Sequence, residues 1–235
     1  RAMPESAQTI RKAAVSPATA RATVMTAVSI LCTDPKHAVN AWLERWAAAV
    51  APRVEVRICR DWRELTGGDF LFLVSCHQII GAAVRALFGH TLVLHASALP
   101  AGRGMSPHIW QILDGCEQLT MTLLEAEDAL DTGRIWHQLD VPIPGTAVCD
   151  EINARIFDAE IALMDWALAH RETVVPRVQS GESSMYRKRV PADSRIDPLR
   201  PLADSFDLLR VADPERYPAF FEHRGRTYRL RIDPL

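Results

Sequence analysis

The sequence predicts an α/β protein built on a mostly parallel sheet with helices on both of its faces. Three nearly continuous apolar runs, at 24–33, 67–76 and 90–97, have the length and composition of strands that are buried on both sides. Segments with helical periodicity follow them along the chain. Strands that alternate with helices form parallel sheets, because each helix carries the chain back across the sheet.

Local signals along the chain predict the other elements. After the first strand, Asp34 is a potential helix cap, and Val39, Leu43, Trp46 and Val50 repeat at helical spacing. Later segments are expected as a strand at 54–59, a helix at 78–88, a helix opened by Ser106 and Pro107 and closed by Gly115, strands at 118–126 and 133–143, and an amphipathic helix at 150–170.

Composition is that of a soluble domain with a sizeable core. The 235 residues are 48% hydrophobic and 24% charged, and the net charge of -2 argues against nucleic acid as the main partner. No apolar run approaches the roughly 20 residues of a membrane span. The five cysteines are dispersed without CxxC spacing, which suits reduced thiols better than a disulfide framework or a zinc site. We therefore expect a cytoplasmic protein without a metal site.

The two ends of the chain differ from its centre. Residues 1–23 are rich in Ala, Arg, Ser and Thr and lack an apolar stretch, which predicts a loose extension rather than a signal peptide. A transit-like segment is the weaker alternative. From residue 176 the periodicity gives way to prolines, with a short helix expected at 202–210 and a strand at 227–232. The sequence thus predicts a main domain at 24–175 and a small appendage at 176–235.

His95 ends the third apolar run and precedes small residues, a proline and a Gly-Arg-Gly turn. Ligands of open parallel sheets bind beyond the carboxyl ends of the strands, and small residues there let a ligand approach the backbone. Asp131 lies in a tight loop between two later strands. A histidine at a strand end is more often structural, and an acidic loop residue is more often a solvated turn former. Neither residue alone predicts a site.

Together the two residues belong to a series of motifs. H-x-S-x-L-P-x-x-R-G begins at His95, W-x-I-L-x-G at Trp110, and L-D-x-G-x-I at Leu130. In this order and spacing the motifs resemble those of the formyltetrahydrofolate-dependent formyltransferases, over about residues 24–170. The resemblance implies a Rossmann-like formyltransferase fold, a catalytic domain at 24–175, and 10-formyltetrahydrofolate as the formyl donor.

The segment 188–221 is similar to the one that follows the catalytic core in the sugar-nucleotide N-formyltransferases. This similarity implies a small-molecule acceptor, the amine of an amino sugar linked to a nucleotide, and leaves a homodimer open. Methionyl-tRNA formyltransferases carry a longer C-terminal barrel, which the remaining residues barely accommodate. The alternatives are a 10-formyltetrahydrofolate hydrolase, a methionyl-tRNA formyltransferase-like enzyme, and a catalytically silent homologue that binds folate or a sugar nucleotide.

The family resemblance assigns roles to two residues and leaves a third unfilled. In the family a protonated histidine stabilises the oxyanion that forms when an amine attacks the formyl carbon, and an aspartate keeps that histidine charged. His95 and Asp131 fall on these positions, and a nearby carboxylate favours imidazolium. The family also has an asparagine two residues before the histidine, where this chain has Val93. A valine cannot donate a hydrogen bond, so the donor comes from elsewhere, the rate is low, or the chemistry differs.

Substitutes for the missing donor are expected at the end of the neighbouring strand, in Ser75, Cys76 and His77. Strand-end packing is an equally weighted alternative for these three residues. Further candidates are Ser97 and Arg103, which fall on family motif positions and are expected to shape the loop, and His108, for which a surface role is favoured. Weaker substrate-binding candidates, which could equally pack on the core, are Arg210, Arg216, Tyr217 and Phe220.

Overall fold

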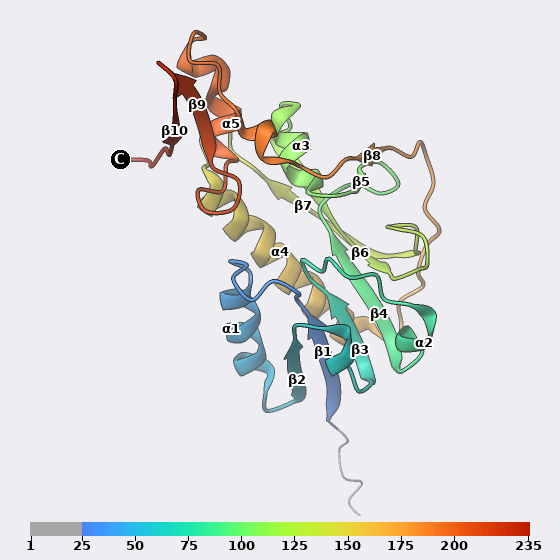
Figure 1. The fold of residues 1–235 in the computed structure, drawn as a ribbon. Coiled ribbons are helices and arrows are strands. Elements are labelled where there is room, and N and C mark those ends of the chain that lie inside the picture. The colour runs from blue at the N-terminus through green and yellow to red at the C-terminus, as the bar shows by residue number, and fades with distance from the viewer. Residues whose placement is uncertain (1–24) are drawn as a thin grey trace, which may run out of the picture.

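The computed structural model of the protein describes residues 25–235, so the extension predicted at 1–23 lies outside the described residues (Figure 1). Six strands form the central sheet, in the order β2-β1-β3-β4-β6-β7. Their bounds are Thr26–Leu31 for β1, Val54–Cys59 for β2, Gly68–Leu73 for β3, Phe88–His95 for β4, Gln118–Glu125 for β6 and Ile135–Pro142 for β7. The first four strands pair in parallel, whereas β6 and β7 add antiparallel. The predicted mostly parallel α/β sheet is confirmed.

Two long helices, α1 (Asn40–Val50) and α4 (Cys149–His170), cover one face of the sheet (Figure 1). The α4 helix begins one residue before the predicted start and ends where it was expected. Indole groups join the two helices, because Trp42 Nε1 donates to Asp158 Oδ1 and Trp46 Nε1 donates to Asp165 Oδ1, both at 2.7 Å. The two helices therefore form a single layer.

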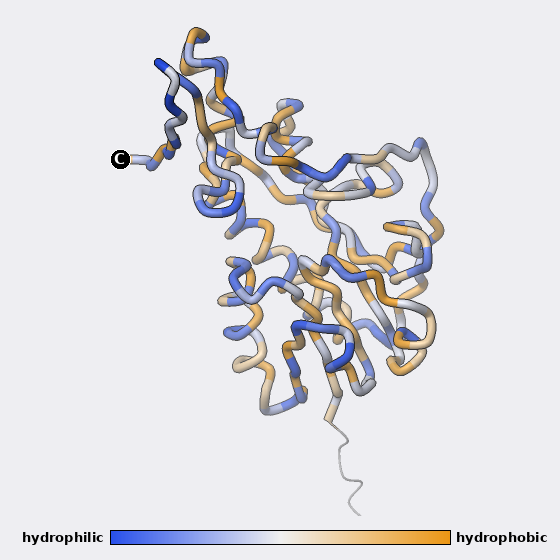
Figure 2. Tube along the Cα trace, in the orientation of Figure 1, coloured by the Kyte–Doolittle hydropathy of each residue, from blue (hydrophilic) through white to orange (hydrophobic). Residues whose placement is uncertain are grey.

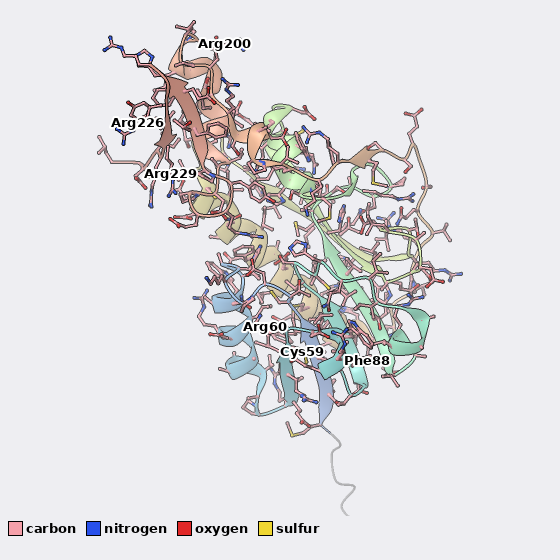
Figure 3. All side chains as sticks on the ribbon, in the orientation of Figure 1. Cys59, Arg60, Phe88, Arg200, Arg226 and Arg229 are labelled. Atoms are coloured by element: carbon pink, nitrogen blue, oxygen red, sulfur yellow. The ribbon has the colours of Figure 1, made fainter. Side chains whose placement is uncertain are left out.

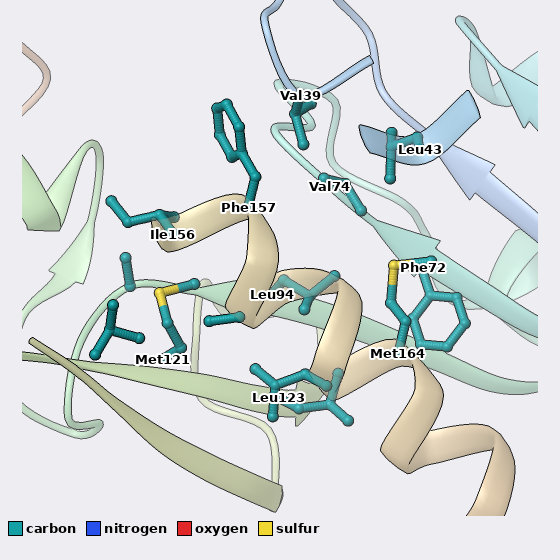
Figure 4. Packing of buried hydrophobic residues seen from close by; sticks show 14 of the residues in the cluster. Val39, Leu43, Phe72, Val74, Leu94, Met121, Leu123, Ile156, Phe157 and Met164 are labelled. Atoms are coloured by element: carbon teal, nitrogen blue, oxygen red, sulfur yellow. The ribbon is translucent and has the colours of Figure 1, made fainter. Parts of the chain in front are cut away.

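The main core lies between this helical layer and the sheet (Figure 4). Phe72 and Leu94, from the neighbouring strands β3 and β4, face Met164 of α4. Leu71 and Leu73 alternate with Phe72 and point to the opposite face, where they join a second buried cluster. Both faces of the central strands are buried, and most of their residues are apolar (Figure 2).

The second face is covered by loops together with a 3₁₀ turn, Trp62–Glu64, and a short helix, α2 (Ala82–Arg85). The helix expected at 78–88 is therefore much shorter than predicted. Gln78 explains the difference, because its side chain accepts a hydrogen bond from Trp62 N and donates one to Asp61 Oδ2, both at 3.0 Å. These tertiary bonds hold residues before Gly81 outside the helix.

The C-terminal part of the chain lies beyond the carboxyl ends of the parallel strands (Figure 1). β8 (Met185–Tyr186) pairs with β5 (Arg103–Gly104), and α3 spans Pro107–Leu113. Further on lie the 3₁₀ turns Pro191–Ser194 and Leu202–Ser205, helix α5 (Phe206–Arg210), and a hairpin of β9 (Ala219–His223) and β10 (Arg226–Leu230). A small separate cluster holds this part together, formed by Ile196, Leu209, Ala212 and Ala219.

The surface of the hairpin is polar, and Figure 3 shows Arg226 and Arg229 pointing outward from β10. All five cysteines are free thiols. Within residues 25–235, no helix combines the length and the apolar character needed to cross a bilayer.

Met164 tests the packing of α4 on the sheet, because its side chain is fully buried in the main core. Met164→Ala is expected to lower the free energy of unfolding by about 2–5 kcal/mol, through lost transfer energy and a residual cavity. Leu199→Ala is the matched control, since Leu199 is 92% exposed. Urea unfolding of both variants measures their free energies of unfolding. Equal values for the two variants would contradict the burial of Met164 in the main core.

Candidate active site

A cavity of about 330 Å³ opens at the carboxyl edge of the sheet, where β1, β3 and β4 end. Its wall combines the loops after β1, β3 and β6, the first turn of α3 and the N-terminal half of α4. The C-terminal segment contributes the rest of the wall through Arg189, Val211, Asp213, Arg216 and Tyr217. The cavity therefore depends on segments from most of the chain.

His95 and Asp131 meet on the wall of this cavity, where they are 6% and 9% exposed. His95 Nε2 lies 2.8 Å from the Gly102 carbonyl oxygen, and Nδ1 lies 3.7 Å from Asp131 Oδ2. Both ring nitrogens face acceptors, an arrangement that an imidazolium satisfies with its two N–H donors. The fold thus brings the two sequence-predicted residues together.

The loop that carries Asp131 is fixed on several sides. Asp131 has φ +54°, a left-handed conformation that aspartate tolerates better than most residues. Its Oδ2 accepts from Gly104 N at 2.9 Å, and its carbonyl accepts from Gln179 Nε2 at 2.8 Å. Arg103 Nη2 donates to Gln179 Oε1 at 2.7 Å. Arg103 therefore acts on the loop through Gln179, a residue that no sequence pattern singled out.

The Gly-Arg-Gly turn after His95 is explained by a close approach of two backbones. Gly104 pairs with Tyr186, has φ +98°, and a Cβ there would lie 2.2 Å from the Tyr186 carbonyl oxygen. Gly102 N donates to Ser184 Oγ at 2.8 Å. The turn thus ties the cavity wall to the start of the C-terminal segment.

Three other predicted residues lie away from the cavity. Ser97 is buried behind the turn, where its carbonyl accepts from Thr122 Oγ1 at 2.6 Å. Arg210 Nε pairs with Asp207 Oδ1 at 2.6 Å and belongs to the packing of α5. Phe220 is part of β9 and is not on the cavity wall. Arg216 and Tyr217, by contrast, do line the cavity.

Ser75, Cys76 and His77 all line the cavity, but their hydrogen bonds differ. Cys76 Sγ donates to the Gln78 carbonyl at 3.4 Å, and burial raises the pKa of this thiol. The backbone amide of His77 donates to Thr33 Oγ1 at 3.1 Å, while its side chain is exposed. Ser75 has φ +46°, a strained conformation that is common at functional sites.

His37 determines how the Ser75 hydroxyl can be used. Burial, together with the nearby charge of Arg216, lowers the pKa of His37 to about 4, so the ring is neutral at pH 7. Its Nδ1 accepts from Val39 N at 3.2 Å, which places the ring proton on Nε2. Nε2 lies 3.3 Å from Ser75 Oγ and therefore donates to it. The Ser75 hydroxyl can therefore donate its own proton to another acceptor.

Two further titratable side chains line the cavity. Burial, and then the charge of Arg189, lowers the pKa of His108 to about 4. Burial alone raises the pKa of Glu160 to about 8, and Glu160 Oε2 has no hydrogen-bond partner among the described residues. Glu160 could have been found in the sequence, because it falls on the same apolar stripe of α4 as Ile156 and Met164. Within residues 25–235, no cluster of three or more His, Cys, Asp or Glu side chains could hold a metal ion.

The comparisons with known proteins identify the family of the chain. Residues 51–168 match the formyl transferase family model, and the chain belongs to this family. The methionyl-tRNA formyltransferase of Novosphingobium aromaticivorans is 32% identical over 140 residues, which cover 59% of this chain and 46% of that protein. That of Sinorhizobium fredii is 32% identical over 146 residues, with the same coverage. The chain thus aligns with about half the length of these relatives.

Solved structures share the fold at lower sequence identity. A methionyl-tRNA formyltransferase from Clostridium thermocellum has a TM-score of 0.73 at 22% identity, covering 87% of this chain and 97% of that one. HypX from Aquifex aeolicus, in complex with tetrahydrofolic acid, has a TM-score of 0.73 at 21% identity, covering 87% and 37%. A sugar N-formyltransferase from Shewanella has a TM-score of 0.68 at 16% identity, covering 88% and 97%. The predicted formyltransferase fold is confirmed.

Glu160 gives the stability of the protein a dependence on pH. An unfolded Glu160 ionises near its ordinary pKa of 4.5, whereas the folded side chain stays protonated up to about pH 8. Unfolding between these values releases a proton, so this residue makes the protein less stable as pH rises. Glu160→Gln removes this ionisation. The melting temperature of the variant minus that of wild type should therefore increase from pH 5 to pH 8. A difference that stays constant across this range would contradict a buried neutral Glu160.

Proposed function

We propose that this protein is an N-formyltransferase that moves the formyl group of 10-formyltetrahydrofolate to the amine of an amino sugar linked to a nucleotide. The observation that carries the proposal is the buried His95–Asp131 pair on the wall of a cavity that the C-terminal segment helps to close. Membership of the formyl transferase family supports the reaction. The acceptor is supported by the similarity of segment 188–221 to the sugar-nucleotide N-formyltransferases.

The cavity suits a folate donor in shape and polarity. Ile79 and Leu130 project from two loops on its wall and are 83% and 53% exposed, so they offer apolar surface to a flat ring system. The donor would supply the formyl carbon that the amine attacks. HypX from Aquifex aeolicus, which shares the fold, has been crystallised with tetrahydrofolic acid.

The residues of this chain would act on the charge and the protons of the reaction. As the amine attacks, its nitrogen bonds to the formyl carbon and negative charge develops on the formyl oxygen. His95, which lies 3.7 Å from the Asp131 carboxylate, would donate to that oxygen after giving up its bond to Gly102. The bond from the formyl carbon to the folate nitrogen then breaks, and the proton lost by the amine passes to that nitrogen. An aimed donor in a site shielded from water is worth about 3 kcal/mol of barrier.

We infer that Ser75 supplies the second donor in place of the family asparagine. Leu73 of β3 pairs with Val93 of β4, and Ser75 and His95 each follow two residues later. Neighbouring strands lie about 4.8 Å apart, which places both residues at the same edge of the sheet. The hydroxyl accepts from His37 and can donate its own proton to the formyl oxygen. Cys76 is less suited, because its thiol already donates to the Gln78 carbonyl.

Variants of the buried pair test the reaction directly. His95→Ala and Asp131→Asn should each lower kcat by about 10²–10⁴-fold, because the first removes the imidazole donor and the second removes the carboxylate that faces it. The double variant should be scarcely slower than either single variant, since the two residues act as one unit. Steady-state kinetics with 10-formyltetrahydrofolate and a panel of nucleotide-linked amino sugars measures these rates. Near-wild-type rates in either folded single variant would sink the assignment.

Ser75→Ala and Val93→Asn test the origin of the second donor. Ser75→Ala should lower kcat by about 10²-fold, the usual effect of removing one oxyanion donor. Val93→Asn should also lower kcat, with some loss of stability, because Val93 packs against apolar clusters that cannot satisfy an amide. A rate gain in Val93→Asn with no loss in Ser75→Ala would overturn this inference. A loss in Cys76→Ala alone would move the role to the thiol.

A hydrolase would use water in place of the amine. Incubation with 10-formyltetrahydrofolate alone separates the two reactions, because rapid turnover without an acceptor indicates hydrolysis. Binding of folate without turnover across a broad amine panel would instead indicate a silent homologue.

A second candidate function, formylation of methionyl-tRNA, is favoured by one surface. The hairpin of β9 and β10 exposes Arg224, Arg226 and Arg229, a basic surface of the kind that contacts phosphate backbones. The sequence relatives reported above are methionyl-tRNA formyltransferases. Transfer of a radiolabelled formyl group to methionyl-tRNA at a rate above that for nucleotide-linked amino sugars would favour this function.

A further inference from the structure

A buried arginine on the cavity wall has no part in the chemistry described above. Arg189 lies between β8 and the turn Pro191–Ser194 and is only 5% exposed. Its Nη2 donates to Ser194 Oγ at 3.0 Å, and its Cζ lies 5.2 Å from the centroid of the Tyr217 ring. Ser194 is itself anchored, because its hydroxyl donates to the Tyr217 carbonyl at 3.2 Å. The guanidinium is therefore held in a fixed position.

No carboxylate among the described residues pairs with this guanidinium. Asp193, its neighbour in sequence, forms a 2.5 Å ion pair with Arg187. Asp213, also on the cavity wall, accepts from two backbone amides of the following turn, both at 2.9 Å. Arg189 Nε is buried without a hydrogen-bond partner in the part of the chain that the structure describes. A guanidinium remains charged in proteins, and a buried charge without a partner is costly.

The fixed charge lies on the same cavity wall as His95. His108, in the first turn of α3, is close enough to both that their charges lower its pKa. Because its ring is neutral at pH 7, His108 does not neutralise an anion by itself and can offer one N–H donor. Asn153 of α4 adds an amide to the same wall. Arg189 is thus the centre of a polar subsite beside the reacting pair.

We propose that Arg189 binds an oxyanion group, either phosphate or carboxylate, that the amine acceptor carries. The planar fork of an arginine matches both groups, and Nε is one of its free donors. The cavity would then select acceptors that bear a negative charge as well as an amine, with the amine directed to His95. The proposal rests on the proposed function for the position of the amine, whereas binding of the anion can be measured without any reaction.

Calorimetric titration tests the subsite in the absence of folate. The probes are inorganic phosphate, UDP and N-acetylglycine, and the proteins are wild type, Arg189→Met, Arg189→Lys and Arg195→Gln. Arg195 is the matched control, since it is exposed, pairs with Glu222 and lies outside the cavity. At least one probe should bind wild type and lose at least about tenfold in affinity in Arg189→Met. Arg189→Lys should lose less, and Arg195→Gln should bind as wild type does.

The probes separate the two sources of the oxyanion. Preference for phosphate or UDP indicates a phosphorylated acceptor, and preference for N-acetylglycine indicates a carboxylated one. The proposal is overturned if no probe binds, if all probes bind Arg189→Met as well as wild type, or if Arg195→Gln loses as much affinity. If Arg189→Met does not fold, wild-type affinity in Arg189→Lys overturns it.

Binding and turnover measurements together separate a failure of the Arg189 subsite from a failure of the proposed formyl transfer. Formyl transfer to neutral amines at the full rate, without Arg189-dependent anion binding, would contradict the subsite alone. Arg189-dependent binding in a protein that formylates no amine would contradict the proposed function and leave the subsite in place.

Discussion

The placement of the buried His95 side chain between two acceptors, on the wall of the cavity, is the constraint on which the surrounding structure depends. A histidine ring with the Gly102 carbonyl on one side and the Asp131 carboxylate on the other keeps its orientation only if both loops are rigid. The loop after β4 is fixed to β8, and the loop after β6 is fixed by Gln179. The start of the C-terminal segment therefore helps to position one imidazole.

The same dependence crosses the boundary predicted at 175/176, between the main domain and the small appendage. Gln179, Ser184 and Tyr186 lie beyond the boundary, yet they hold the turn and the loop that flank His95. Only the later part, around Ile196 and Leu209, has a cluster of its own. The appendage thus begins as a support for the loops beside His95 and becomes a separate packing unit only near the hairpin.

The cavity favours neutral forms of several groups that are charged, or partly charged, in water. Burial keeps His37 and His108 unprotonated at pH 7 and keeps Glu160 protonated. The Asp131 carboxylate and the Arg189 guanidinium are buried charged groups of the wall, whereas Glu127, Asp128 and Arg216 on the same wall are exposed to solvent. Charges in such surroundings act more strongly on a substrate than they would in water. The site is therefore polarised by a small number of fixed groups.

The apolar strands, helix α4 and the candidate residues His95 and Asp131 can be derived from the sequence alone, because each follows from local periodicity or from a motif of fixed spacing. The length of α2, the pairing of His37 with Ser75 and the burial of Arg189 depend on the tertiary structure. Each of these rests on contacts between segments that are distant in the sequence, such as Gln78 with Asp61 or Ser194 with the Tyr217 carbonyl. Periodicity reports which face of one element is buried, but it carries no information about which distant polar group will satisfy a side chain there.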